Sequence, residues 1–280
     1  MWSFTAGAEV FSSPAIANGV VYVGSYDHNV YALNASTGAK LWSFATGGLV
    51  LSSPAVANGL VYVGSEDFNV YALNASTGAK VWSLATNSFV YSSPAVADGV
   101  VYVGSEDGNV YALNARTGVA VWPSPFPTSG VVHSSPAVAN GVVYVGSWDG
   151  NVYGITNTGL GLWFWTFPTG SVVQSSPVVA NGVVYVGSEN DNLYALNAST
   201  GAKLWSFAEG TPAFSSPVVA DGVVYVGSLD NNVYAFDLAG GTTPAKRNGA
   251  VARPNPATLV PDYSLKPSQP SAGVTAEATD

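Results

Sequence analysis

Short apolar runs, separated by turn residues, recur along residues 1–240 with nearly the same sequence. Residues 52–86 show the pattern, with four β-rich runs that read SSPAVA, LVYVGS, NVYALN and VWSLAT. Asn-Gly, Asp-x-Asn and Ser-Thr-Gly sequences separate these runs, and such sequences favour tight turns between antiparallel strands. Each unit is therefore predicted to form four antiparallel strands.

The unit occurs six times, with copies that start near residues 11, 51, 91, 133, 174 and 214. The second run, such as Val20-Val21-Tyr22-Val23, is apolar at every position, whereas a strand with one wet face alternates. A lone four-stranded sheet cannot bury both of its faces, so each unit needs neighbours. We therefore predict an all-β fold, a β-propeller of six four-stranded antiparallel blades within residues 1–240.

The two ends of the chain predict how the ring closes. The sixth copy lacks the Trp-containing fourth run, and the sequence Trp2-Ser3-Phe4-Thr5 supplies one at the other end. We predict that residues 1–10 pair as the outer strand of the last blade and so remove an open sheet edge. The alternative is a piece of a seven- or eight-bladed ring. Residues 241–280 are rich in Pro, Ala, Ser and Thr and are expected to form a flexible tail.

The amino-acid composition excludes several classes of binding partner and of site. The chain has 17 acidic and 8 basic residues, a net charge of −9, which disfavours nucleic acid and anionic membrane surfaces. It has no cysteine, so disulfides and thiolate metal sites are excluded. It contains no apolar stretch long enough to cross a membrane, and its N-terminus lacks a signal-peptide pattern. We expect a monomer with no membrane insertion.

One motif in the repeats resembles a known family. Tyr-Ala-Leu-Asn-Ala-x-Thr-Gly-x-x-x-Trp occurs at residues 31–42, 71–82, 111–122 and 194–205, and a shorter variant occurs at 153–163. It is similar to the tryptophan-docking motif of the PQQ-like β-propeller repeat family. The resemblance implies that a Trp from each blade packs against the turn of a neighbouring blade. The expected docking residues are Trp2, Trp42, Trp82, Trp122, Trp163 and Trp205.

The same resemblance leaves the function open. The family includes quinoprotein dehydrogenases, a propeller lipoprotein of outer-membrane assembly, and sensor domains attached to kinases, so it implies a periplasmic or extracellular location. The Cys pair, calcium site and catalytic Asp of the dehydrogenases have no matching positions here. We expect no enzyme activity and no cofactor, with neither PQQ nor calcium bound. A PQQ-dependent dehydrogenase, or a remnant of one, remains the alternative.

Two repeated features suggest catalysis or metal binding, but each has a simpler structural explanation. Twelve serines lie in the Ser-Ser-Pro motifs, but the chain has only two histidines, so six Ser-His-Asp sites are impossible. The serines are expected to satisfy backbone groups beside the inner strand. The recurring turn aspartates could bind calcium. However, Asp followed two residues later by Asn is typical of a turn that bonds its own backbone, so no metal site is predicted.

Differences between the repeats indicate a binding surface. The residues before Ser-Ser-Pro and after Gly-Ser vary from copy to copy, and the topology places both at one face around the central channel. We predict that this face binds a protein or peptide, because exposed aromatic residues on loops are candidate anchors. Carbohydrate binding and simple drift at turn tips are the alternatives. The predicted binding residues are Tyr26, His28, Phe68, Tyr91, His133 and Trp148.

Overall fold

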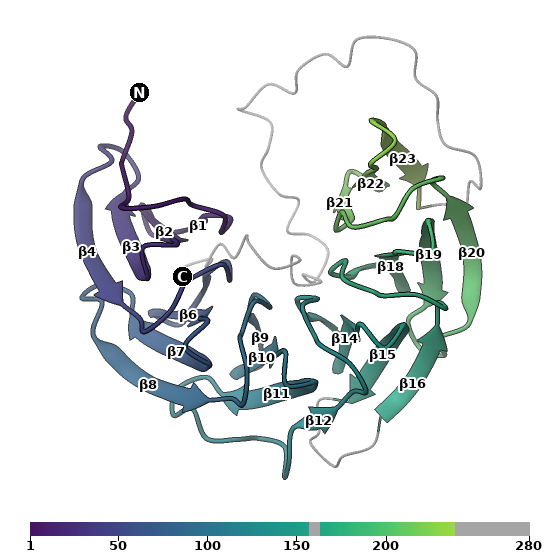
Figure 1. Ribbon diagram of the computed structural model, residues 1–280, viewed down its shortest axis with the longest axis horizontal. Helices are drawn as coiled ribbons and strands as arrows, with labels where there is room; N and C mark the ends of the chain where they lie inside the picture. The colour runs from purple at the N-terminus through teal and green to yellow at the C-terminus, as the bar shows by residue number, and fades with distance from the viewer. Residues whose placement is uncertain (157–162, 239–280) are drawn as a thin grey trace.

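The protein folds into six antiparallel sheets arranged around a common axis, as the computed structural model shows for residues 1–156 and 163–238 (Figure 1). Five sheets have four strands and the last has three. No helix occurs among the described residues. The prediction of an all-β fold with six blade-like sheets is therefore confirmed, and the predicted tail at residues 241–280 lies outside the described part.

Each blade repeats the same four positions, from the axis outward. The short inner strands are β1 (Ala15–Ala17), β5 (Ala55–Ala57), β9 (Ala95–Ala97), β13 (Ala137–Ala139), β17 (Val178–Ala180) and β21 (Val218–Ala220). The second strands are β2 (Val20–Gly24), β6 (Leu60–Gly64), β10 (Val100–Gly104), β14 (Val142–Gly146), β18 (Val183–Ser188) and β22 (Val223–Gly227). The third strands are β3 (Asn29–Asn34), β7 (Asn69–Asn74), β11 (Asn109–Asn114), β15 (Asn151–Thr156), β19 (Asn192–Asn197) and β23 (Val233–Asp237). The outer strands are β4 (Lys40–Ala45), β8 (Lys80–Ala85), β12 (Phe126–Pro127), β16 (Trp163–Pro168) and β20 (Lys203–Ala208).

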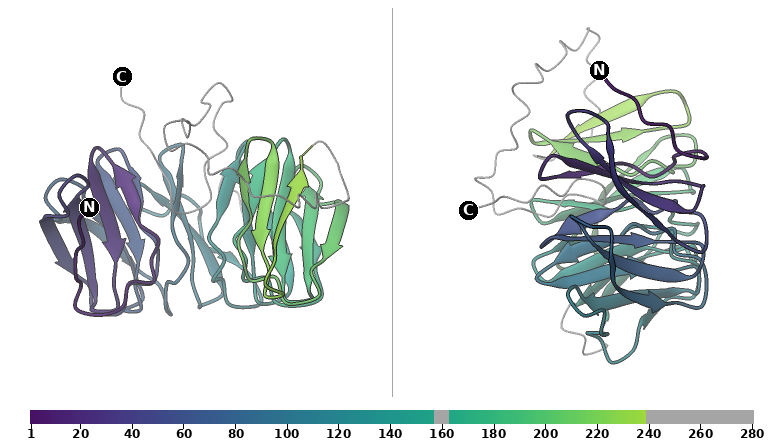
Figure 2. Two further views of the ribbon diagram at one scale, coloured as in Figure 1. Left: turned by 90° about the horizontal axis from the view of Figure 1, so that it is seen from above. Right: turned by 90° about the vertical axis from the view of Figure 1, so that its left-hand side faces the viewer.

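The hydrophobic core lies between blades. One buried cluster, for example, joins Tyr22 and Trp42 of the first blade to Val61 and Tyr71 of the second. Blades stand side by side with their strands running between the two ends of the ring (Figure 2). Since the middle strands are apolar on both faces, each interior blade is covered on both sides, and this explains why their sequences do not alternate.

Tryptophan docking joins the first blade to the second, the second to the third and the fourth to the fifth. The indole Nε1 of Trp42 donates a hydrogen bond of 2.9 Å to the carbonyl oxygen of Ala75, in the β7–β8 turn of the following blade. The ring also lies on Gly78, where an added Cβ would come within 2.8 Å of it. The same 2.9 Å bond joins Trp2 to Ala35, Trp82 to Ala115 and Trp165 to Ala198.

The fourth blade corrects one prediction. The residue predicted to dock was Trp163, but the docking contact is made by Trp165, since its Nε1 bonds Ala198 and its ring lies on Gly201. In the first, second and fifth blades Trp is followed by Ser and then Phe or Leu, and Trp165-Thr166-Phe167 keeps that spacing. The shift arises because the fourth repeat is longer between its third and outer strands. The remaining predicted docking residues, Trp122 and Trp205, pack against Tyr102 and Tyr185 of their own blades.

The two serines of each Ser-Ser-Pro motif have separate structural roles. The first, such as Ser52, accepts a hydrogen bond from the backbone N–H of Gly64, which ties the inner strand to the second strand of its own blade. The second serine links neighbouring blades: the hydroxyl of Ser53 accepts a bond from the N–H of Ser13, and the N–H of Ser53 donates to Ser93. Five such bonds, all 2.9 Å long, form a serine belt: Ser13–Ser53, Ser53–Ser93, Ser93–Ser135, Ser135–Ser176 and Ser176–Ser216.

Closure of the ring by residues 1–10 does not appear in the structure. Trp2 docks on the first blade as the other tryptophans dock on theirs, and Phe4 packs on Tyr31 of the same blade. However, the described residues of this segment pair with no strand, and β21, β22 and β23 form a sheet of three. Figure 1 shows β1 and β21 at the two separated ends of an arc.

The indole packed on Gly78 gives a stability prediction. Gly78 and Gly59 both have a φ of +73°, but only Gly78 would bring a Cβ against an indole. Gly59→Ala should lower the free energy of unfolding by about 1–2 kcal/mol, because alanine disfavours the left-handed conformation. Gly78→Ala should lower it by this amount and by about 1–3 kcal/mol more, because the added Cβ overpacks against the indole. Urea unfolding midpoints of the two variants measure this difference, and equal midpoints would show that the docking contact does not constrain this position.

Candidate functional site

The candidate site lies at one end of the ring, which we call the rim. There the turn between the second and third strands of a blade meets the connection that enters its inner strand. Backbone bonds fix the two together: Glu66 N–H donates to Leu49, Glu106 to Phe89 and Trp148 to Val131, at 2.9–3.0 Å. The varied residues of the rim therefore project from a backbone that is the same in each blade.

An aspartate holds the backbone in place in five of these six turns. The Oδ2 atom of Asp67 accepts 2.6 Å hydrogen bonds from the Tyr71 hydroxyl and from the Gly47 N–H of the preceding blade. Burial raises the pKa of Asp67, but the bonds from Tyr71, Gly47 and Asn69 outweigh this and lower the pKa overall. In the fifth blade Asn190 takes this place and bonds Tyr194. Asp67, Asp107 and Asp149 thus join neighbouring blades. They also accept bonds from the backbone of their own turns, which is the role that the Asp-x-Asn spacing predicts.

Five rings form a continuous row on the rim, which we call the aromatic ladder: Phe68, Phe89, Tyr91, His133 and Trp148. Successive ring centroids lie 5.3, 5.7, 5.0 and 4.7 Å apart. The ladder crosses from the second blade to the fourth, and its two ends, Phe68 and Trp148, are 42% and 41% exposed. These distances are typical of attractive aromatic pairs.

Phe68 adopts a backbone conformation that is unfavourable for a residue with a bulky side chain. Its φ is +70°, in the left-handed region, and the equivalent positions of the third and fourth blades are Gly108 and Gly150. A bulky residue in this region costs roughly 1–2 kcal/mol relative to glycine. A side chain kept exposed at such a position is consistent with a role at the surface.

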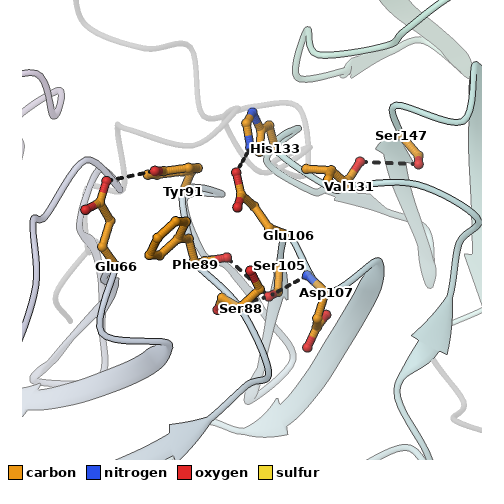
Figure 3. Close-up of polar contacts among 10 residues, drawn as sticks. All are labelled: Glu66, Ser88, Phe89, Tyr91, Ser105, Glu106, Asp107, Val131, His133 and Ser147. Carbon is orange, nitrogen blue, oxygen red and sulfur yellow. Dashed lines mark hydrogen bonds and ion pairs between the residues drawn. The ribbon is translucent and has the colours of Figure 1, made fainter.

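Two carboxylates line the ladder (Figure 3). Tyr91 donates a 2.7 Å hydrogen bond to Oε1 of Glu66, and Nε2 of His133 lies 2.7 Å from Oε1 of Glu106. Burial, reinforced by the bond to Glu66, raises the pKa of the Tyr91 hydroxyl above its usual range, so it remains a donor at physiological pH. Each pair joins neighbouring blades, and the Tyr91–His133 ring contact joins the two pairs.

The structure brings together four of the six predicted binding residues, Phe68, Tyr91, His133 and Trp148. Tyr26 lies on the rim of the first blade, where it stacks on Phe11 at 4.7 Å. His28 is an exposed turn residue of that blade, outside the ladder. Phe89 was missed by the sequence analysis. The available signal was its position, since the equivalent residues of the second, fourth and fifth blades are aliphatic: Leu49, Val131 and Val172.

Glu209 is an unusual buried acid at the rim end of the fifth blade. It replaces the threonine of the other blades, Thr46, Thr86, Thr128 and Thr169, whose hydroxyls donate to backbone carbonyls. Glu209 is 4% exposed, and neither carboxylate oxygen has a hydrogen-bond partner. Burial raises the pKa of its carboxyl to about 7, while the Ser228 hydroxyl opposes the shift and the Asp230 charge adds to it.

The described residues contain no group of three His, Cys, Asp or Glu side chains that could hold a metal ion. They also contain no helix long and apolar enough to cross a membrane. Fold and rim together define a β-propeller whose candidate site is a solvent-facing row of rings and carboxylates.

Comparison with known proteins identifies the family. The family model described as "Outer membrane protein assembly factor BamB" matches residues 1–50, 45–164 and 149–244. The chain therefore belongs to this family of PQQ-like propellers.

Two solved structures share the fold. BamB from Moraxella catarrhalis superposes with a TM-score of 0.74 at 24% identity, over 87% of this chain and 78% of that chain. The computationally designed Ika8 protein superposes with a TM-score of 0.73 at 18% identity, over 81% of this chain and 70% of that one. Comparison with curated protein sequences gives no match.

The buried Glu209 predicts that stability depends on pH. Its folded pKa of about 7 lies above the unfolded value of 4.5, so its contribution is complete below pH 4.5 and is lost as pH rises through 7. Glu209→Gln should therefore gain stability relative to wild type as the pH rises. Its free energy of unfolding, minus that of wild type, should be roughly 2–3 kcal/mol larger at pH 8 than at pH 4.5. Glu209→Thr, which restores the residue of the other blades, should behave in the same way. Chemical unfolding at both pH values measures this, and parallel profiles for all three proteins would contradict it.

Proposed function

We propose that this protein is a non-enzymatic scaffold whose rim binds a protein or peptide partner. The aromatic ladder carries the proposal, since it presents rings from three blades on a fixed backbone, with Phe68 and Trp148 exposed at its ends. Aromatic side chains anchor protein partners well because they bury a large area at a small cost in conformational entropy. No rearrangement of the ring is needed to expose them.

The hydrogen bonding of the serines supports a role without catalysis. The hydroxyls of Ser52 and Ser53 accept bonds from Gly64 and Ser13, and the equivalent serines repeat these contacts around the ring. They act as structural acceptors, and His133 is bonded to Glu106. The family's description as an outer-membrane assembly factor supports a protein partner and a periplasmic location.

Peptide selection tests the binding surface. A random peptide library displayed on phage is selected against the full-length protein, and affinities of enriched peptides are then measured for variants. Trp148→Ala and Phe68→Gly should weaken binding at least tenfold, since each removes an exposed end of the ladder; Phe68→Gly restores the residue type of two other blades and should keep the turn folded. Val119→Ala, an exposed position at the opposite end of the ring, is the control and should bind as wild type.

The outcomes separate the candidate functions. Enriched peptides that bind all variants equally, or a library that yields none, would contradict the proposal. Glycan binding that depends on Trp148 would favour a carbohydrate-binding propeller. Dye-reducing activity after incubation with PQQ and calcium would favour the dehydrogenase.

We also propose that residues 1–10 complete the last blade and close the ring. Trp2 already occupies the docking position on the first blade, and the last blade has three strands in the described structure. In the first blade Ala45 pairs with Asn29, and the same register places Thr5 opposite Asn232.

Engineered cysteines test the closure, because the chain has no cysteine of its own. A Thr5→Cys, Asn232→Cys variant should form an intramolecular disulfide under mild oxidation, since Cβ atoms of directly opposite residues lie about 4.5–5.5 Å apart. The control pair, Thr5→Cys with Asp237→Cys, should not. Non-reducing electrophoresis with mass spectrometry measures the product. Free thiols in both variants would contradict closure, and disulfide-linked dimers would show that the strand is exchanged between chains.

A further inference from the structure

Charge is divided between the two ends of the ring. The described residues include fourteen acidic side chains, of which eleven lie at the rim and three, Asp98, Asp221 and Asp237, at the opposite end. All four basic residues of the described part lie at that opposite end, in the turns before the outer strands or at the starts of those strands: Lys40, Lys80, Arg116 and Lys203. Among the described residues, the rim therefore carries negative charge with no lysine or arginine to balance it.

The carboxylates beside the aromatic ladder are only partly used. Glu66 and Glu106 each engage one oxygen, Oε1, with Tyr91 and His133. Among the described residues the only close contact between a basic and an acidic side chain is the one between His133 and Glu106, and no lysine or arginine lies within ion-pair distance of a carboxylate. The second oxygen of each carboxylate accepts no hydrogen bond within the described chain, and the Glu106 side chain is 21% exposed. Each glutamate therefore keeps acceptor capacity for a ligand.

Ring and carboxylate together select one kind of side chain. A guanidinium or ammonium group is attracted to the face of Trp or Tyr, and it donates hydrogen bonds to carboxylates. A surface lined by one sign of charge also raises the local concentration of oppositely charged ligands. Trp148, Tyr91, Glu66 and Glu106 supply both kinds of contact within one connected group of side chains.

We infer that the rim recognises a basic segment of a protein partner, with an arginine or lysine side chain seated against the ladder between Glu66 and Glu106. The inference rests on the proposed binding function and specifies the chemistry of its partner. The acidic rim disfavours acidic segments by the same interaction, so the choice of partner depends on charge as well as on aromatic contact.

A matched peptide pair tests the inference on the full chain. The probe is a fluorescein-labelled twelve-residue peptide of four Gly-Arg-Ser repeats, and its partner probe has citrulline, which is neutral and nearly isosteric, in place of arginine. Fluorescence anisotropy should show that wild type binds the arginine peptide at least tenfold more tightly in 20 mM NaCl. The difference should shrink in 150 mM NaCl, because salt screens exposed charges.

Variants locate the binding to the ladder. The double variant Glu66→Gln, Glu106→Gln should bind the arginine peptide at least fivefold more weakly than wild type. Asp98→Asn with Asp221→Asn removes the same charge at the opposite end, at positions whose φ of +50° suits Asn, and should change the affinity less than twofold. Circular dichroism confirms that both double variants are folded.

The results distinguish this inference from the binding function on which it rests. Equal binding of the arginine and citrulline peptides, or equal weakening by the two double variants, would overturn the basic partner. Selected library peptides that depend on Trp148 but lack arginine and lysine would overturn it too, while the binding function stands. A library without any rim-dependent peptide would remove both.

Discussion

Cross-blade docking of an indole on a neighbouring turn is the contact on which the rest of the structure depends. A four-stranded sheet of this sequence is apolar on both faces, so no blade is stable alone. The bond from Trp42 to Ala75 fixes the distance and the rotation between two blades at once, because the same ring also covers Gly78. The hydrogen bond between Gly47 and Asp67 at the rim, and the one between Ser13 and Ser53 at the inner edge, then join blades that docking already holds in register.

This arrangement explains why one end of the ring can vary. The backbone of each rim turn is held by bonds that involve main-chain atoms and an Asp or Asn, so the shape of the turn does not depend on the side chains of the varied residues next to them. Aromatic and acidic side chains can then collect across several blades without disturbing any one of them. Phe68 marks the limit of that freedom, since it accepts a strained backbone where two other blades have glycine.

Most of the fold could be predicted from the sequence, because the six copies show the same strands, turns and docking residues side by side. The motif spacing in the fourth copy predicts Trp163 as the docking residue, whereas Trp165 occupies that position because the connection before the outer strand is one residue longer there. The site was found only in part. Repeat comparison located Tyr91 and His133, but the contact between their two rings depends on the distance between neighbouring blades, which no single repeat contains.

The serine belt has a consequence for how such a ring changes in size. Each bond runs in the same direction, from the N–H of one serine to the hydroxyl of the next, and each involves only two adjacent copies. A whole copy inserted or deleted between them would restore the same donor and acceptor at the new junction. Growth and shortening of the array by complete modules are therefore tolerated at the inner edge, and the curvature of the array, rather than any local bond, limits how many modules can complete a circle.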